Sequence, residues 1–285
     1  GPSGVSRTLV LMDGVPLNDP FGGWVYWTRV PLQGVDRIEL VNGSSSSLYG
    51  NFAMGGVINV VSTTPARRTL DVSTQYGNHQ SPKLDVFAGN AWSRGSVAFS
   101  GSAFRTDGFP IVLAAERGKV DNQATVEFGN FLLRGEYQPT PRISAFGRLG
   151  YFRENRDNGK ASTIDGTEEA NNTRWTSASA GVRWLLPDGS DLQANVFGDV
   201  ETFHSNFLAV PVVTPLRSIG RMSLNQRVPV TGIGGMAQWA RMLGRWQQVQ
   251  IGGDWKSTDG ESQEDGLDGV TGTTVTLHRL SGATQ

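Results

Sequence analysis

The chain has 285 residues, a formal net charge of −1 and no cysteine, so it can hold one or two domains and has no disulfide, thiolate ligand or cysteine nucleophile. The near-neutral charge provides no basic surface of the kind that nucleic acid requires, so no nucleic-acid partner is expected. Its longest apolar runs, such as Phe109–Ala115, fall far short of the ~18 residues of a membrane-spanning helix.

The first part of the chain predicts a small domain of short, buried strands. Thr8–Asp13, Val35–Val41 and Gly56–Ser62 are rich in Val, Ile and Leu and are flanked by Gly, Pro and Asn, as buried strands of a compact domain are. Ser44–Tyr49 predicts a single helical turn that begins with a serine cap. The domain is expected to end near Thr63–Arg68.

From residue 68 onward the chain predicts long amphipathic strands. Asp191–Glu201 is the clearest example, because its apolar and polar residues alternate. One face carries Leu192, Ala194, Val196, Gly198 and Val200, and the other carries Gln193, Asn195, Asp199 and Glu201, with Phe197 among them. The same two-residue period recurs along the rest of the chain, which predicts about ten strands.

Short and long connections alternate between these strands. The connections at Ser93-Arg94, 139–141, 187–190 and 243–245 are short, whereas the stretches near 106–122, 154–172, 205–227 and 258–270 are long and polar. The brief connection around Asn78–Lys83 is the exception. This alternation is typical of an outer-membrane β-barrel, which has short periplasmic turns and longer outer loops.

The apolar face of the strands is expected to contact lipid, because unpaired polar groups cost several kcal/mol in hydrocarbon whereas a plugged or water-filled lumen tolerates them. Aromatic residues near the strand ends are expected to form interfacial girdles. These residues are Tyr76, Tyr137, Tyr151, Trp175, Trp184, Trp239, Trp246 and Trp255. The alternative is a soluble, carbohydrate-binding β-sandwich, in which the same rings would be core residues or stacking platforms.

Three blocks near the amino terminus carry a resemblance to a known family. They are Leu11–Asn18, Val35–Gly43 and Ser47–Val61, in that order along the chain. Together they resemble the second half of the plug domain of TonB-dependent outer-membrane receptors, over roughly residues 5–63. The strands that follow are similar in pattern to the opening part of that family's barrel.

The resemblance implies a mainly β fold, a partial transmembrane antiparallel β-barrel of about ten strands preceded by part of a small α+β plug domain. Residues 1–65 would be the C-terminal part of the plug, and residues 66–285 the first, incomplete part of the barrel. Because plugged transporters close at about 22 strands, the sequence is expected to be a fragment with two open sheet edges that cannot transport alone.

The resemblance also implies active import across the bacterial outer membrane. A scarce solute, such as an iron chelate or cobalamin, would bind the plug apex and the outer loops. The TonB energy-transducing complex would then import it with energy from the inner-membrane proton gradient. The expected partners are therefore outer-membrane lipid, the TonB complex and a small-molecule solute, whereas a porin or adhesin barrel would need no plug.

Asn18–Trp27 is the segment best suited to contact the solute. The resemblance places it at the plug apex, facing outside. Its aromatic rings provide apolar contact area at low rotamer cost, although Trp24 and Trp27 could instead wedge the loop against the barrel wall. The candidate substrate-binding residues are Asn18, Asp19, Phe21, Trp24, Tyr26 and Trp27.

A second set of residues is expected to build the plug or to contact the barrel wall. The glycines in this set suit positive φ or close backbone approach, and Asp13 can accept backbone hydrogen bonds that close its turn. Arg37 and Glu39 share a strand face, which predicts either a charge network to the wall or a solvated pair worth under ~1 kcal/mol. The full set is Asp13, Gly14, Arg37, Glu39, Gly43, Tyr49, Gly50, Gly55, Gly56 and Asn59.

The sequence contains no pattern that predicts catalysis. His79, His204 and His278 are widely separated and lack ligand spacing, and no nucleophile elbow occurs. The acidic residues of the stretch 154–172 are interpreted as solvated; they are Glu154, Asp157, Asp165, Glu168 and Glu169. We therefore expect no enzyme activity, no cofactor and no metal site.

Overall fold

The computed structural model describes residues 8–43, 53, 55–268 and 274–281. An amino-terminal domain contains a four-stranded sheet in the order β2-β1-β4-β3. Its strands are β1 (Thr8–Met12), β2 (Val15–Pro16), β3 (Val35–Asn42) and β4 (Gly56–Ser62). β1 and β4 are parallel, and the other pairs are antiparallel. The short 3-10 helices η2 (Trp27–Arg29) and η3 (Leu32–Gly34) lie between β2 and β3.

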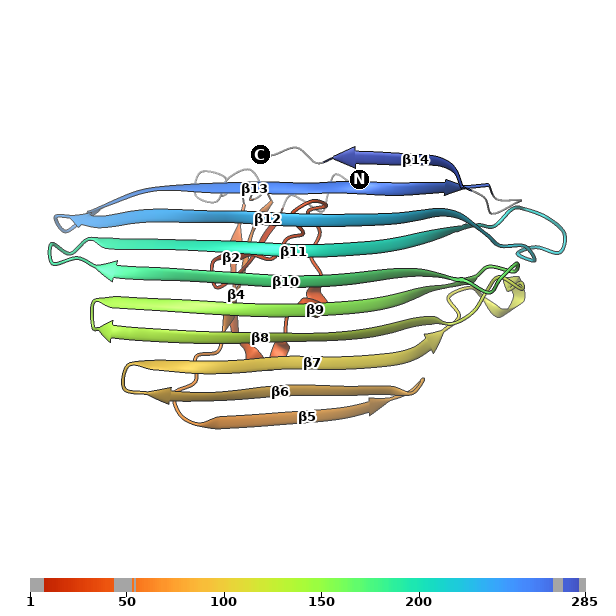
Figure 1. Ribbon diagram of the computed structural model, residues 1–285. Coiled ribbons are helices and arrows are strands. Elements are labelled where there is room, and N and C mark those ends of the chain that lie inside the picture. The colour runs from red at the N-terminus through yellow and green to blue at the C-terminus, as the bar shows by residue number, and fades with distance from the viewer. Residues whose placement is uncertain (1–7, 44–52, 54, 269–273, 282–285) are drawn as a thin grey trace.

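The rest of the chain forms one sheet of ten antiparallel strands, called the wall here, in which each strand pairs with its neighbours in sequence. Figure 1 shows the amino-terminal domain lying against one face of the wall, with the short turns at one end and the longer loops at the other. The strands are β5 (Thr69–Gly77), β6 (Ser81–Trp92), β7 (Gly95–Phe109), β8 (Ala124–Thr140), β9 (Ile143–Ala161), β10 (Glu168–Leu185), β11 (Asp191–Ala209), β12 (Arg221–Leu243), β13 (Gln247–Leu267) and β14 (Thr274–Ser281). The helix η5 (Ala114–Glu116) lies in the loop between β7 and β8.

The two faces of the wall differ in polarity as the alternation predicts. On β11, Val196 and Val200 are 62% and 58% exposed on the outward face, whereas Asp199 and Glu201 are buried on the inward face. The polar face covers the amino-terminal domain and the apolar face is left exposed. This arrangement contradicts the β-sandwich alternative, in which the apolar faces of two sheets would be pressed together.

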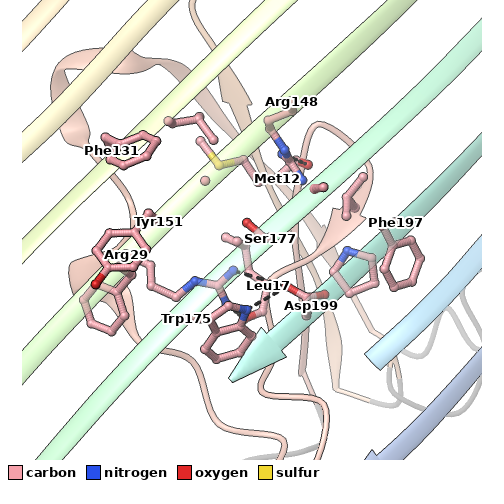
Figure 2. A pocket seen from close by; sticks show the side chains of 16 residues that line it. Met12, Leu17, Arg29, Phe131, Arg148, Tyr151, Trp175, Ser177, Phe197 and Asp199 are labelled. Atoms are coloured by element: carbon pink, nitrogen blue, oxygen red, sulfur yellow. Dashed lines mark hydrogen bonds and ion pairs between the residues drawn. The ribbon is translucent and has the colours of Figure 1, made fainter. Parts of the chain in front are cut away.

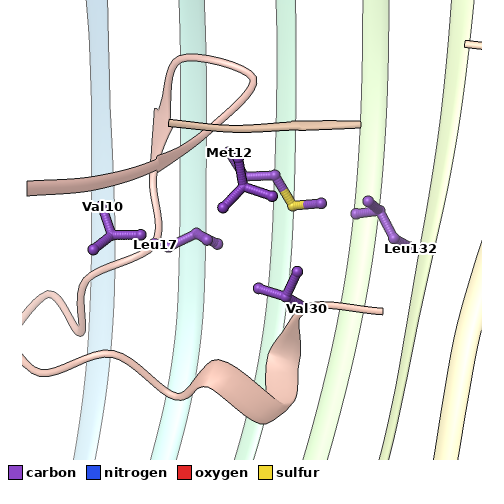
Figure 3. Packing of buried hydrophobic residues seen from close by; sticks show 6 residues of the cluster. Val10, Met12, Leu17, Val30 and Leu132 are labelled. Carbon is purple, nitrogen blue, oxygen red and sulfur yellow. The ribbon is translucent and has the colours of Figure 1, made fainter. Parts of the chain in front are cut away.

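The amino-terminal domain and the wall share a hydrophobic cluster. Val10, Met12, Leu17 and Val30 of the domain are buried together with Leu132 of β8, and Val60 completes the cluster (Figure 3). Burying a side chain of this size contributes about 1.5–3 kcal/mol. The domain is therefore attached to the wall by apolar packing as well as by polar contacts.

One residue assigned to the aromatic girdle lies elsewhere. Trp175 is 2% exposed on the inward face of β10, so its assignment to the membrane interface is wrong. The physical reason is strand parity, because Trp175 shares its face with Ser177 and Ser179, which also point toward the amino-terminal domain.

The strands extend further into the expected long loops than the sequence predicted. β9 continues to Ala161 and β10 begins at Glu168, so the loop expected at 154–172 is reduced to residues 162–167. The 205–227 and 258–270 stretches are also largely strand. Polar side chains do not stop backbone pairing, and β12, with 23 residues, is longer than the ~9–11 residues that cross a bilayer.

The structure accounts for some of the predicted glycines. Gly14, Gly43 and Gly56 have positive φ, and a Cβ on Gly56 would lie 2.8 Å from the Val41 carbonyl oxygen. Gly55 does not belong to the positive-φ residues of the described part of the chain. Tyr49, Gly50 and the helical turn expected at 44–49 lie outside the described residues.

The connection between the two sheets runs from the end of β4 at Ser62 to the start of β5 at Thr69. Among the residues that the structure describes, no helix is long and apolar enough to span a bilayer.

A charge on the outward face of β11 tests the assignment of the two faces. With the outward face in lipid, as the resemblance implies, we expect V196R to lower the free energy of unfolding of the full-length protein in bilayers by about 2–4 kcal/mol, because its guanidinium would enter hydrocarbon. Q193R, on the inward face of the same strand, is the control and should cost less than ~1 kcal/mol. Urea unfolding followed by tryptophan fluorescence measures both values, and equal losses would contradict the assignment.

Candidate functional site

The loop Asn18–Trp27 is held by the two polar side chains at its start. The Asn18 side chain accepts a hydrogen bond from the Val10 amide at 2.8 Å and donates to the Gly23 carbonyl at 3.0 Å. The Asp19 carboxylate accepts one from the Phe21 amide at 2.8 Å. Both residues are buried, so their described contacts fix the loop rather than face solvent.

The aromatic side chains of the loop divide into a buried and an exposed group. Tyr26 is half-buried, packs against Phe152 and Trp175, and receives a hydrogen bond from Thr173. Burial raises the pKa of its phenol. The rings left open are those of Phe21, Trp24 and Trp27, which are 37%, 38% and 54% exposed.

Arg29, two residues after the loop, connects it to the wall. Its guanidinium lies 3.5 Å from the centre of the Trp175 ring, and its Nη2 atom lies 3.7 Å from Asp199 Oδ1. The Trp175 indole donates to the same carboxylate at 2.7 Å, and Figure 2 shows the three side chains meeting between the two sheets. Burial lowers the pKa of Arg29 to about 10, although Asp199 acts in the opposite direction.

A second polar contact is centred on Asp13, at the end of β1. Its carboxylate accepts hydrogen bonds from the Ser62 amide at 2.9 Å and the Ser62 hydroxyl at 2.6 Å. It also faces Arg148 of β9 at 3.6 Å and Arg134 of β8 at 3.8 Å. Arg148 donates to the Met12 carbonyl at 2.7 Å. Asp13 thus joins β1, β4 and the wall, a wider role than closing its own turn.

Glu201 of β11 lies buried beside Asp19 of the loop. Within the described residues, no hydrogen-bond donor reaches either oxygen of the Glu201 carboxylate. The structure thus brings two carboxylates together between the loop and the wall.

Arg37 and Glu39 make their observed contacts inside the amino-terminal sheet. The Arg37 guanidinium pairs with Glu39 and with Asp36 at 2.8 Å, and Glu39 accepts a hydrogen bond from Asn59 at 3.0 Å. The Asn59 side chain in turn accepts one from the Gly14 amide at 3.3 Å. All three charged groups are about half exposed, which matches the solvated pair among the two sequence interpretations.

The long loops at one end of the wall are joined to one another. Arg217, in the loop between β11 and β12, forms a two-pronged ion pair with Asp121, in the loop between β7 and β8. The hydrogen bond from Arg217 lowers the pKa of the Asp121 carboxyl. Val120 beside it is fully buried, and its amide donates to the Arg217 carbonyl at 3.1 Å. The loop at 162–167 joins them, because the Thr163 amide donates to the Gly220 carbonyl at 2.9 Å.

The acidic residues expected at 154–172 have structural contacts. Glu154 faces the amino-terminal domain and accepts a hydrogen bond from Thr28 at 2.7 Å, and Glu169 pairs with Lys160 at 2.9 Å. Hydrogen bonds from Ser162 and Thr167 lower the pKa of the Asp165 carboxyl to about 2. The described residues contain no group of three or more His, Cys, Asp or Glu side chains that could hold a metal ion.

The amino-terminal sequence matches a family model. Residues 1–57 match the TonB-dependent receptor plug domain. Over these residues the chain is similar to that plug domain, and the amino-terminal domain is called the plug here. The resemblance inferred from the three sequence blocks is thereby confirmed, and the match argues against the porin or adhesin alternative, which lacks a plug.

Individual proteins are similar to this chain in sequence or in fold. The chain is 37% identical over 86 residues to the vitamin B12 transporter BtuB of Vibrio cholerae serotype O1. The matched segment makes up 30% of this chain and 14% of that transporter. The ferric enterobactin receptor PfeA of Pseudomonas aeruginosa has a similar fold with a TM-score of 0.63 at 17% identity, over 97% of this chain and 46% of that receptor. The ferric citrate transporter FecA has a similar fold with a TM-score of 0.68 at 15% identity, over 100% of this chain and 43% of that transporter. The chain thus spans less than half of these receptors.

Sequence reasoning missed the residues that seat the plug on the wall. Arg29, Arg148, Trp175 and Asp199 were not among the predicted site residues, although all four are buried at the interface. A signal was present in the alternation, because each of the three wall residues lies on the polar face of its strand. The sequence could not predict which plug residue contacts each of these three wall residues.

Removing the Asp13 carboxylate tests how the plug is held. We expect D13A to weaken plug seating by about 3 kcal/mol or more, because it leaves Arg148 buried without its charge partner. Hydrogen exchange of the β1 and β4 amides in the full-length protein measures this loss.

D36A is the matched control, because Asp36 is an exposed plug carboxylate paired with Arg37 and its loss should cost less than ~1 kcal/mol. If D36A loosens β1 and β4 as much as D13A does, the contact from Asp13 to the wall is not what holds the plug.

Proposed function

We propose that this chain is part of an outer-membrane receptor that binds a scarce solute at the plug apex and the outer loops. In this proposal the solute, such as an iron chelate or cobalamin, is imported with energy from the inner-membrane proton gradient, delivered by the TonB complex. The observation that carries the proposal is the loop Asn18–Trp27, in which Phe21, Trp24 and Trp27 stay exposed while Asn18 and Asp19 anchor the backbone.

The geometry of this loop suits solute capture. Rings on a rigid loop bind amphipathic molecules with little loss of side-chain entropy. Trp24 packs edge-on against Tyr26 and against Phe203 of β11, so the wall contributes to the same aromatic surface. The proposed binding residues are therefore the three exposed rings, with Asn18, Asp19 and Tyr26 as their support.

The proposed location is the bacterial outer membrane. The exposed apolar face of the wall would contact lipid and its polar face would enclose the plug. Residues 1–65 would serve as the C-terminal part of the plug and residues 66–285 as the first ten strands of a larger barrel. The relatives named above are transporters and receptors, and the same role, rather than catalysis, is proposed for this protein.

Uptake in cells tests the proposal. The full-length gene would be expressed in a Gram-negative host that lacks its own receptors, and ferric citrate, a ferric catecholate and cyanocobalamin would be supplied in labelled form. The proposal expects at least one of these to accumulate in cells with an intact TonB complex and only to bind at the surface of cells without it. Accumulation that is independent of TonB, or no binding of any probe, would contradict it.

Substitution of the exposed rings tests the binding surface. We expect the double variant W24A/W27A to weaken surface binding of the transported probe by about tenfold or more, because large buried rings dominate contact energy. W246A is the control, since Trp246 is 93% exposed in a turn at the opposite end of the wall. Unchanged affinity in W24A/W27A would exclude these rings from the binding surface.

A further inference from the structure

The outward face of the wall carries a group of three arginines and a histidine that the import function does not use. They are Arg153 of β9, Arg174 of β10 and Arg227 of β12, with His204 of β11 among them, and the group is called the cationic patch here. All four are exposed, and they lie on four adjacent strands. Their sequence positions place them on the same face as the outward apolar residues of each strand.

Strand register brings the four side chains together. Arg153 and Arg174 are directly opposite each other, and His204 is directly opposite Arg227. Arg174 and His204 are diagonal neighbours, because Arg174 is opposite Thr202. The register therefore places the four side chains next to one another.

The patch is not neutralised by the protein. No ion pair between described residues involves any of its four members, and the described contact of Arg227 is a hydrogen bond to the neutral Gln263 at 3.2 Å. The carboxylates nearest to it in the register, Glu127 beside Arg153 and Glu261 beside Arg227, form no ion pair with any of the three arginines. Like charges placed directly opposite destabilise a sheet, so an external anion would offset the repulsion between Arg153 and Arg174.

The position of the patch indicates where that anion comes from. Phe99, Phe131 and Tyr151 stack on one another across β7, β8 and β9 on the outward face. Arg153 lies two residues beyond Tyr151, toward the long loops. Stacked aromatics next to an apolar band are typical of the level at which lipid headgroups begin. The patch therefore lies at the headgroup level of the outer leaflet.

We propose that the cationic patch binds the phosphate groups of an anionic lipid of the outer leaflet. Two arginines with free guanidinium groups can each hold a phosphate through paired N–H donors. The uncharged residues between the cations, Asn155, Asn172 and Thr202, add donors and acceptors for the rest of a headgroup. The lipid's acyl chains would extend along the exposed apolar side chains below, such as Val200 and Tyr151.

This inference rests on the proposed membrane location, and lipid binding by the purified full-length receptor tests it. The receptor would be reconstituted in phosphatidylcholine nanodiscs, and binding of bisphosphorylated lipid A would be measured by native mass spectrometry. We expect R153Q/R174Q to weaken that binding by about tenfold or more, since each arginine near a charged lipid surface contributes roughly a factor of five.

R105Q is the matched control, because Arg105 is exposed on the same face but is paired with Asp107 and lies opposite Glu127. It should leave lipid A affinity unchanged.

A second measurement separates binding from folding. In detergent without phosphorylated lipid, R153Q/R174Q should melt no lower than the parent, because it removes a like-charge pair, whereas added lipid A should raise the melting temperature of the parent more than that of the variant.

Equal lipid A affinity in the parent and R153Q/R174Q would overturn the inference. Displacement of lipid A by millimolar inorganic phosphate would also overturn it, because it would assign the patch to a soluble anion. Failure of the proposed membrane location looks different, since neither the parent nor any variant would then insert into nanodiscs.

Discussion

The structure depends on the placement of buried charge between the plug and the wall. Arg148 and Asp199 lie on wall strands and point away from the apolar face. Unpaired, each would cost several kcal/mol. Asp13 and Arg29 of the plug provide the opposite charges. The Trp175 ring packs against the Arg29 guanidinium, and its indole N–H donates to the Asp199 carboxylate. The plug is therefore part of what makes the inward face of the wall stable.

This constraint also explains how the apex loop is positioned. Arg29 is fixed against the wall and Asn18 is fixed against β1, so both ends of the loop between them are restrained. The aromatic rings that remain exposed lie on a backbone that is already ordered. A loop of this kind binds with a smaller entropic penalty than a flexible one, which connects the buried ion pairs to the proposed capture of a solute.

Much of the fold could be predicted from the sequence because the strand signals are strong. The alternation in Asp191–Glu201 assigned both faces of β11, and three of the four plug strands were located to within a residue or so. The predictions were weaker where tertiary contacts decide. Trp175 was assigned to a girdle by residue type, and the ends of β9 and β10 were missed because polar residues continue to pair. Asn18 and Asp19 were expected to touch solute. In the structure Asn18 bonds the Val10 amide, a contact distant in sequence that no local pattern encodes, whereas Asp19 closes a local turn with the Phe21 amide.

The central claim is that one side of β11 faces the plug and that its other side, in the proposed membrane location, faces lipid. The 285 residues contain no cysteine, so single cysteines can be introduced from position 193 to position 200, spin-labelled and tested for collision with oxygen, which enters lipid, and with a water-soluble nickel complex. The account predicts a two-residue period in oxygen collisions, high at positions 194, 196 and 200 and low at 193, 195 and 199. Equal collision rates on both faces, or the opposite phase, would contradict it.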